Sequence, residues 1–323
     1  MVCLYMQKKG INKIMRIFIS GSTGLVGRNI LEKLAAEKFE LLTPSSSELN
    51  LLDYTKVFEY IKTQKPDVII HCAGKVGGIQ ANMKDPYGFL MENLVMGTNL
   101  VTAAKNADVK KFLNLSSSCA YPRNAQSPLT EDLILKGELE PTNEGYALAK
   151  ITIMKMCEYI TQENNGFYYK TMIPCNLYGK WDKFSPENSH MIPGVIRKIH
   201  EAKRNNLDKI ETWGDGTARR EFMYAGDLAD CICTAIKDFE SLPTVMNVGI
   251  GDDFSINEYY EIIAKVIGYK GSFTRDLTKP VGMKQKLLNV EKQKIWGWKA
   301  QNTLEEGIKK TYEFYREQEQ AYV

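Results

Sequence analysis

The sequence predicts an α/β protein that contains a doubly wound parallel sheet and a smaller C-terminal domain. Three observations lead to this fold class. Residues 16–27 read as an apolar strand, a glycine-rich turn and the start of a helix. Short apolar runs then alternate with helical patterns up to about residue 180, and the alternation weakens further along the chain. Such alternation favours a parallel sheet covered by helices, with ligands at the carboxyl ends of the strands.

The composition is that of a globular protein with two packed lobes. The chain has 323 residues, of which 44% are hydrophobic and 25% charged, and its formal net charge is +3. So small a net charge does not indicate a nucleic-acid partner, but it is compatible with an anionic small ligand held by local positive groups. We expect a dinucleotide-binding domain over residues 15–180, to which the chain returns around 222–250. Residues 181–323 are expected to form mainly a substrate-binding domain.

Cysteine and histidine usage bears on compartment and metals. The seven cysteines are scattered, odd in number and without zinc spacing, which predicts reduced thiols in a cytoplasm. The three histidines are too dispersed for an obvious metal cluster, so no metal is expected. No apolar run is long enough to cross a bilayer, so no membrane partner is expected either.

The first expected strand, residues 16–20, leads into the turn Gly21-Ser22-Thr23-Gly24-Leu25-Val26-Gly27 and a helix over about 28–38. Strand, glycine turn and helix in this order are the context of a Rossmann-type dinucleotide fingerprint, here spaced G-x-x-G-x-x-G. Gly21 permits a tight turn, Gly24 lets the backbone approach a pyrophosphate, and Gly27 allows close packing of helix on strand. The helix N-terminus then offers unpaired N–H groups to the phosphates.

The second strand, near residues 40–43, leaves the choice between NAD and NADP open. An acid at its end would bind a ribose 2′-hydroxyl, and an arginine would bind a 2′-phosphate. The sequence has neither, because the strand is followed by a proline and three serines, with Ser46 in the middle. Asp53 either accepts from the adenine amino group or caps the next helix.

Four more strands are expected at residues 67–73, 111–115, 171–174 and 245–249. Long helices are expected after Pro86 and from Tyr146, with further helices at 192–202 and 304–317. His71 lies inside a strand and is expected to be a core residue. The polar stretch 180–190 is long enough to be a functional loop.

The stretch from Ser116 to Lys150 carries the expected chemistry. Ser116, Ser117 and Cys119 follow the strand at 111–115, where a strand ends and a loop begins. Tyr146 and Lys150 are four residues apart and project from one face of a helix. A lysine beside a phenol is expected to lower the tyrosine pKa, and Tyr146 is then a proton donor to a carbonyl that becomes an alkoxide. A Tyr-x-x-x-Lys pair by itself is also an ordinary helix surface pair.

Taken together, these residues resemble the extended short-chain dehydrogenase/reductase superfamily, and within it the GDP-L-fucose synthase family. The resemblance runs from about Arg16 to the last helix. Its most specific pieces are 75–79, 117–122, 140–146, 188–193 and 220–222. It implies an NAD(P)H-dependent enzyme that acts on GDP-4-keto-6-deoxy-mannose as a 3,5-epimerase and 4-reductase. The product would be GDP-L-fucose or a closely related GDP-sugar. NADP(H) is the cofactor that the resemblance favours, without excluding NAD(H), and a homodimer is implied.

The resemblance also implies a role for individual residues. Ser117, Tyr146 and Lys150 would form the reductase triad, and Cys119 and His190 the acid/base pair of epimerisation. The GDP-sugar would be bound by Lys198, Trp213, Arg220 and Lys286. Besides the glycine turn, the cofactor would contact Ser46, Asp53, Leu115, Ser116, Lys150, Pro174, Asn176, Leu177 and His190.

The sequence departs from the family pattern in two places. Arginines that bacterial members commonly place near Ser46 and Thr23, where the 2′-phosphate of NADP would lie, are absent. In the substrate lobe, a family aspartate is replaced by Val281 and another by Asn289, which leaves the exact sugar open.

Two other functions remain as alternatives. One is an NAD(P)H-dependent C-4 ketoreductase of another GDP-sugar, such as a GDP-4-keto-heptose, without significant epimerase activity. The other is a non-catalytic dinucleotide-binding regulator, which the intact set of catalytic residue types argues against.

Overall fold

The computed structural model describes residues 14–163, 165–186, 189–278 and 283–321. Its centre is a six-stranded sheet in the order β10-β5-β4-β3-β1-β2, in which every neighbouring pair of strands is parallel. The strands are β1 (Met15–Ser20), β2 (Phe39–Leu42), β3 (Val68–His71), β4 (Lys111–Leu115), β5 (Tyr168–Pro174) and β10 (Val245–Val248). The predicted doubly wound parallel sheet is therefore confirmed.

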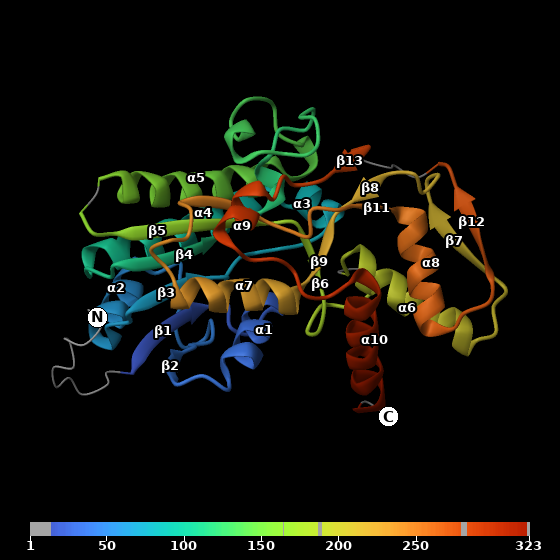
Figure 1. Cartoon of the computed structure of the whole chain (residues 1–323), viewed down its shortest axis with the longest axis horizontal. Helices are drawn as coiled ribbons and strands as arrows, with labels where there is room; N and C mark the ends of the chain where they lie inside the picture. Colours follow the sequence, from blue (N-terminus) through green and yellow to red (C-terminus); the bar gives the residue numbers. More distant parts are fainter. Residues whose placement is uncertain (1–13, 164, 187–188, 279–282, 322–323) are drawn as a thin grey trace, which may run out of the picture.

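Helices cover both faces of this sheet (Figure 1). Side chains alternate along a strand, so Ile17 and Ile19 pack with α1 (Leu25–Leu34) and α7 (Ala225–Lys237). Phe18 points to the opposite face, where it belongs to the cluster formed by α2 (Tyr54–Gln64), α4 (Pro86–Asn106) and α5 (Glu144–Gln162). The sheet is buried on both faces, which explains why its strands read as short apolar runs.

The rest of the chain forms smaller sheets beside one end of the central sheet (Figure 1). They are β11-β8-β13, β12-β7 and β6-β9. Their strands are β6 (Asn176–Tyr178), β7 (Lys209–Trp213), β8 (Arg219–Arg220), β9 (Phe222–Tyr224), β11 (Phe254–Ser255), β12 (Ser272–Asp276) and β13 (Gln285–Lys286). The accompanying helices are α6 (Met191–Arg204), α8 (Ile256–Ile267) and α10 (Leu304–Ala321), whereas α9 (Glu291–Trp296) packs against β10 of the central sheet. Ile196, Ile263 and Ile308 bring α6, α8 and α10 into one hydrophobic cluster.

The connections that matter for the site contain short helices. They comprise α3 (Ile79–Lys84) and the single-turn helices η1 (Ser118–Ala120), η2 (Glu131–Leu133) and η3 (Pro141–Asn143). None of the helices in the part of the chain that the structure describes is both long and apolar enough to cross a membrane.

The structure corrects one local expectation and confirms another. The first helix spans residues 25–34 rather than 28–38, because the glycine at its N-cap lets the helix begin directly after the turn. His71 is a core residue, as expected. It is 3% exposed, its Nδ1 lies 2.9 Å from the Ser20 hydroxyl, and burial lowers its pKa to about 3.

Candidate active site

The glycine turn has the geometry that a dinucleotide needs. Gly21 has a φ of +73°, and a Cβ there would lie 2.6 Å from the backbone nitrogen of Ala73. A Cβ on Gly27 would lie 2.3 Å from the Gly21 carbonyl oxygen, so both positions exclude a side chain. Gly24 is the N-cap of α1, and no side chain caps this helix. The free N–H groups of α1 are thus left for an anionic group.

Beside this turn, the ends of β1 and β2 enclose a cavity of about 260 Å³. Ser22, Thr23 and Ser46 line it together with the apolar residues Leu49 and Met96. An apolar slot rimmed by hydroxyls suits an adenosine, and the free helix N-terminus next to it suits a pyrophosphate. The residues present therefore fit the nicotinamide dinucleotide that the fold implies.

Asp53, expected to hold adenine or to cap a helix, is a helix cap. Its Oδ1 accepts a hydrogen bond from the backbone N–H of Lys56 at 3.1 Å, and it is the N-cap of α2. The other cofactor residues named from the sequence lie at strand ends. Leu115 ends β4 and is followed by Ser116, Pro174 ends β5, and Asn176 and Leu177 belong to β6. The buried hydroxyl of Ser116 has no hydrogen-bond partner within the protein, as expected of a group that faces a ligand.

The three residues expected to form the reductase triad come together near the carboxyl end of β4. Ser117 is the N-cap of η1, and its hydroxyl accepts a hydrogen bond from the backbone N–H of Cys119. Ser117 is also hydrogen-bonded to the side chain of Tyr146. Lys150 is 7% exposed and donates from Nζ to the Leu115 carbonyl at 3.0 Å. Its Nζ lies 5.7 Å from the centre of the Tyr146 ring.

The expectation that Lys150 lowers the pKa of Tyr146 is wrong. Burial raises the Tyr146 pKa well above its ordinary value, nearby Cys119 raises it further, and the Ser117 hydrogen bond opposes both. Burial also lowers the pKa of Lys150 to about 8. The sequence could not weigh these effects, because the four-residue spacing shows proximity and not desolvation. A phenol with a raised pKa stays protonated at neutral pH and is a proton donor.

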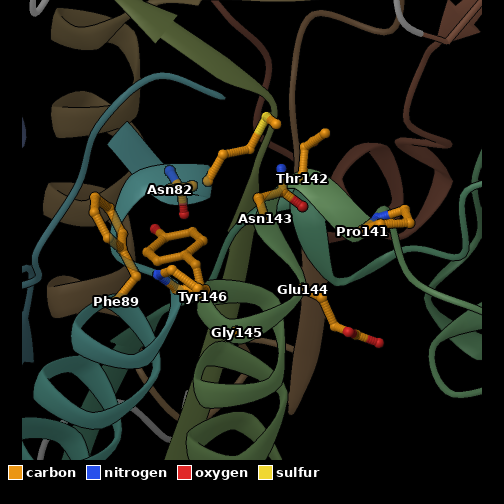
Figure 2. Close-up of a pocket in the computed structure, with 10 residues that line it drawn as sticks. Asn82, Phe89, Pro141, Thr142, Asn143, Glu144, Gly145 and Tyr146 are labelled. Carbon is orange, nitrogen blue, oxygen red and sulfur yellow. The ribbon is translucent and has the colours of Figure 1, made fainter. Parts of the chain in front are cut away.

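Asn143 is a site residue that the sequence reasoning did not single out. Its Nδ2 donates to the Cys119 Sγ at 3.3 Å, and its Oδ1 is buried without a partner. The only sequence signal was its place in the stretch 140–146. Asn143 lines a cavity of about 190 Å³ that also includes Asn82, Phe89 and Tyr146. In Figure 2, Asn82, Phe89 and Tyr146 point toward a common space, while the Glu144 carboxylate points away from it.

His190 comes later in the chain, at the N-cap of α6. Its Nδ1 is 3.3 Å from the Oδ1 of Asp182, a carboxylate that is 2% exposed. This hydrogen bond raises the His190 pKa above its ordinary value, more than burial lowers it. Among the described residues, neither a hydrogen bond nor an ion pair joins His190 to Cys119.

The four residues expected to bind the GDP-sugar form two pairs. Arg220 and Lys286 are register partners on the neighbouring strands β8 and β13. Lys198, on α6, donates from Nζ to the carbonyl of Glu211 in β7, the strand that ends at Trp213. Burial lowers the pKa of both Arg220 and Lys198. The Trp213 side chain is 56% exposed.

The two departures in the substrate lobe have different outcomes. Asn289 accepts a hydrogen bond from the backbone N–H of Glu291 through Oδ1, at the start of α9. Asparagine and aspartate both accept such a hydrogen bond from the backbone two residues on, so this replacement has a local explanation. Val281 lies outside the described residues. Within those residues, no three His, Cys, Asp or Glu side chains gather as a metal site would require.

The parallel sheet, the glycine turn and the Ser–Tyr–Lys arrangement define the class, an NAD(P)-dependent enzyme of the extended short-chain dehydrogenase/reductase fold. Residues 17–249 match the model of the NAD dependent epimerase/dehydratase family, and the chain belongs to that family.

Its curated relatives carry GDP-sugar names. The chain is 54% identical to GDP-L-colitose synthase of Yersinia pseudotuberculosis over 93% of this chain and 98% of that protein. It is 46% identical to GDP-L-fucose synthase of Azorhizobium caulinodans over 94% of this chain and 97% of that protein. Among solved structures, it is similar to a GDP-mannoheptose C4 reductase from Campylobacter jejuni with NADP bound. The TM-score is 0.87 and the identity 29%, over 95% of this chain and all of that one.

Proposed function

We propose that this protein is a GDP-4-keto-6-deoxy-sugar 3,5-epimerase and 4-reductase that makes GDP-L-fucose or a closely related GDP-sugar. The observation that carries the proposal is that groups suited to reduction and to epimerisation lie on one turn. Ser117 is hydrogen-bonded to Tyr146, and Cys119, two residues further on, is hydrogen-bonded to Asn143. A proton donor for a C-4 oxygen therefore lies next to a thiol suited to proton transfer at neighbouring carbons.

In the reduction, the residues of the chain control a single oxygen. A bound nicotinamide supplies the hydride that reduces C-4. Tyr146 donates a proton to the oxygen at C-4, and its raised pKa keeps it protonated for this task. Ser117 holds the same oxygen by a hydrogen bond. Lys150, fixed by the Leu115 carbonyl, places a buried positive group beside the phenol and the cofactor.

In the epimerisation, the C-4 ketone makes the protons on C-3 and C-5 acidic, because their loss gives an enolate. Ser117 and Tyr146 stabilise the enolate oxygen through the hydrogen bonds that they use in reduction. Cys119 in η1 and His190 at the N-cap of α6 are proposed to remove and return protons at carbon on different faces of the ring. The imidazole and the thiol are the side chains that titrate nearest to neutral pH.

The GDP part of the substrate needs cations and an aromatic surface. Arg220 and Lys286, adjacent across β8 and β13, are proposed to hold the pyrophosphate. Trp213 and Lys198 are proposed to contact the nucleotide or the sugar. We further propose NADPH as the preferred reductant, a cytoplasmic location, and the division into domains at residues 15–180 and 181–323. The similar reductase of known structure has NADP bound, which supports the cofactor preference.

A homodimer through α4 and α5 is proposed as well. Leu148 and Tyr159 are 40% and 59% exposed. They are separated by eleven residues, or three helical turns, so they lie on one face of α5. Tyr87, at the start of α4, is 74% exposed. Large apolar side chains on the exposed faces of adjacent helices are what a helix-to-helix interface would cover.

The second candidate is a C-4 ketoreductase without epimerase activity, and similarity to the GDP-mannoheptose C4 reductase supports it. Another relative is named a GDP-L-colitose synthase. Colitose lacks the 3-hydroxyl of fucose and has no stereocentre at C-3, so an enzyme that makes it would invert C-5 alone.

One experiment separates these functions. The protein is incubated in D2O with GDP-4-keto-6-deoxy-mannose, its 3-deoxy analogue or a GDP-4-keto-heptose, with and without NADPH. Deuterium at C-3 and C-5 followed by reduction supports the proposal. Reduction without deuterium establishes the plain ketoreductase.

A further inference from the structure

The side chain of Asp182 is directed at the one imidazole that the proposed function uses. Its Oδ1 is 3.3 Å from the Nδ1 of His190. We propose that Asp182 is a positioning residue that fixes the His190 ring through Nδ1 and stabilises its protonated form, leaving Nε2 to give a proton to the sugar ring. This rests on the proposed function, because it assigns His190 the donor side of an epimerisation.

The turn before His190 is built to hold this carboxylate. The backbone N–H of Asp182 donates to the Gly179 carbonyl at 3.3 Å, and Trp181 between them has a φ of +69°. A bulky residue in the left-handed region is strained, and such strain persists only where the surroundings determine it. At this position a glycine would be the unstrained choice. The tryptophan must therefore be retained by contacts of its own.

Those contacts come from two other elements. The Arg28 guanidinium of α1 lies 4.7 Å from the centre of the Trp181 ring, and Phe314 of α10 packs edge-on against that ring at 4.7 Å. Asn29, also of α1, donates from Nδ2 to the Lys180 carbonyl at 3.0 Å. Helix α1, whose free N-terminus suits a dinucleotide, thus also supports the turn that carries Asp182.

The surroundings of the carboxylate indicate a partner with positive charge. The side chain of Asp182 is 2% exposed. Its Oδ1 also accepts from the Lys183 backbone N–H at 2.8 Å, and its Oδ2 is buried without a partner. A buried carboxylate with so few hydrogen bonds is costly unless a cation faces it. Protonated His190 is the cationic group that the described contacts place there, and the pairing raises the pKa of His190.

The pairing determines which nitrogen of His190 can give up a proton. With Nδ1–H bound to the carboxylate, the transferable proton is on Nε2. An enolate carbon takes this proton and forms a C–H bond, and the ring becomes neutral. Solvent then returns a proton to Nε2, so the cycle balances. Among the described residues, the charged groups that act on His190 are Asp182, which raises its pKa, and Lys183, which lowers it.

The first test measures His190 without any substrate. The chain has three histidines, and the NMR signals of imidazole-labelled protein can be assigned with His190→Gln. His71, with a pKa of about 3, does not titrate between pH 5 and 9. In Asp182→Asn we expect the His190 pKa to fall by about one unit or more. In the matched control Lys183→Gln, which removes an opposite charge from the next residue, it should stay or rise slightly. An unchanged His190 pKa in Asp182→Asn would overturn the proposal.

The second test is functional. In Asp182→Asn, deuterium exchange into GDP-4-keto-6-deoxy-mannose at pH 8 should fall about tenfold or more. Its decline with rising pH should begin at lower pH than in wild type. Reduction of a substrate whose stereocentres are already set should stay within about twofold, as should NADPH binding. Asp182→Glu, which keeps the charge at a longer reach, should recover part of the exchange and provides a second variant if Asp182→Asn does not fold.

The outcomes separate this proposal from the one on which it rests. Normal exchange in Asp182→Asn would show that Asp182 does not position His190. Equal losses of exchange, reduction and NADPH binding would show that Asp182 only supports the folded structure. Absence of exchange in wild type would instead overturn the epimerase function, and with it the role of the pair, even if the His190 pKa falls in Asp182→Asn.

Discussion

Asn143 donates a hydrogen bond from Nδ2 to the Sγ of Cys119 across 3.3 Å. An N–H donor stabilises a thiolate more than a thiol. Because the two residues come from η1 and η3, this contact also fixes the thiol relative to the start of α5, where Tyr146 lies. The contact therefore connects the two activities proposed for the site.

We predict that Asn143→Ala lowers solvent exchange at the sugar carbons about tenfold and leaves reduction of a pre-epimerised substrate within about threefold. Asn143→Asp should lower exchange further, since a carboxylate disfavours a neighbouring thiolate. Glu144→Gln is the matched control, because this side chain points away from the cavity in Figure 2. Equal rates of exchange in Asn143→Ala and wild type would rule out this role.

Tyr146→Phe is expected to bind NADPH almost as wild type and to lose reduction by roughly a hundredfold to ten-thousandfold. The reason is that only the hydroxyl is removed while the ring still packs beside Lys150. Fluorescence titration of the cofactor and single-turnover oxidation of NADPH would measure the two properties. Wild-type turnover in this variant would remove Tyr146 as the proton donor.

Glu221 makes the stability of the protein depend on pH. Its side chain is 1% exposed and accepts from the backbone N–H groups of Gly251 and Leu288. Burial raises its pKa from 4.5 to about 7. A carboxyl with a raised pKa binds its proton more tightly in the folded state, so the stability that Glu221 contributes is fully present below pH 4.5 and is lost as the pH rises through about 7. From pH 5 to pH 8 the loss due to this group should be about 2–3 kcal/mol.

Urea unfolding at several pH values would measure this dependence. The Glu221→Gln variant should show a flatter profile over the same range, because it has no proton to release. Its overall stability should be lower, since an amide cannot accept from both N–H groups as a carboxylate does. A Glu221→Gln profile as steep as that of wild type would assign the pH dependence to other groups.

Dimerisation is predicted to depend on the exposed face of α5. Tyr159→Glu, and Leu148→Asp more strongly, should shift the protein toward monomer at micromolar concentration, because each places a charge where an apolar contact is proposed. Ile295→Asp is a suitable control, since Ile295 is 78% exposed on α9, outside that face. Sedimentation velocity would decide, and a wild-type monomer would exclude the interface.

The central sheet could be predicted almost fully, because strands buried on both faces read as uninterrupted apolar runs separated by turn residues. All six strands were placed within a few residues. The small sheets beside it could not be, since β8, β11 and β13 have two residues each and so have no period to detect. The division into domains stays a prediction.

For the site, sequence spacing was sufficient to bring Tyr146 and Lys150 together, and the resemblance added Ser117, Cys119 and His190. Asn143 and Asp182 were missed because an isolated polar residue in a loop has no pattern, and its contact is made only by the fold. The direction of the Tyr146 pKa was wrong for a related reason. Neighbouring charges can be read from spacing, whereas burial depends on the whole packed structure.

The central claim, that one site performs both epimerisation and reduction, is tested most directly by following one substrate in D2O by NMR. Wild type and Cys119→Ser are each given GDP-4-keto-6-deoxy-mannose without NADPH, and then a 4-keto sugar with its stereocentres already set together with NADPH. We predict deuterium at C-3 and C-5 with wild type only, because a serine hydroxyl is too weak an acid to form the base. We predict reduction with both proteins. Reduction without any exchange by wild type, or normal exchange by Cys119→Ser, would contradict the account.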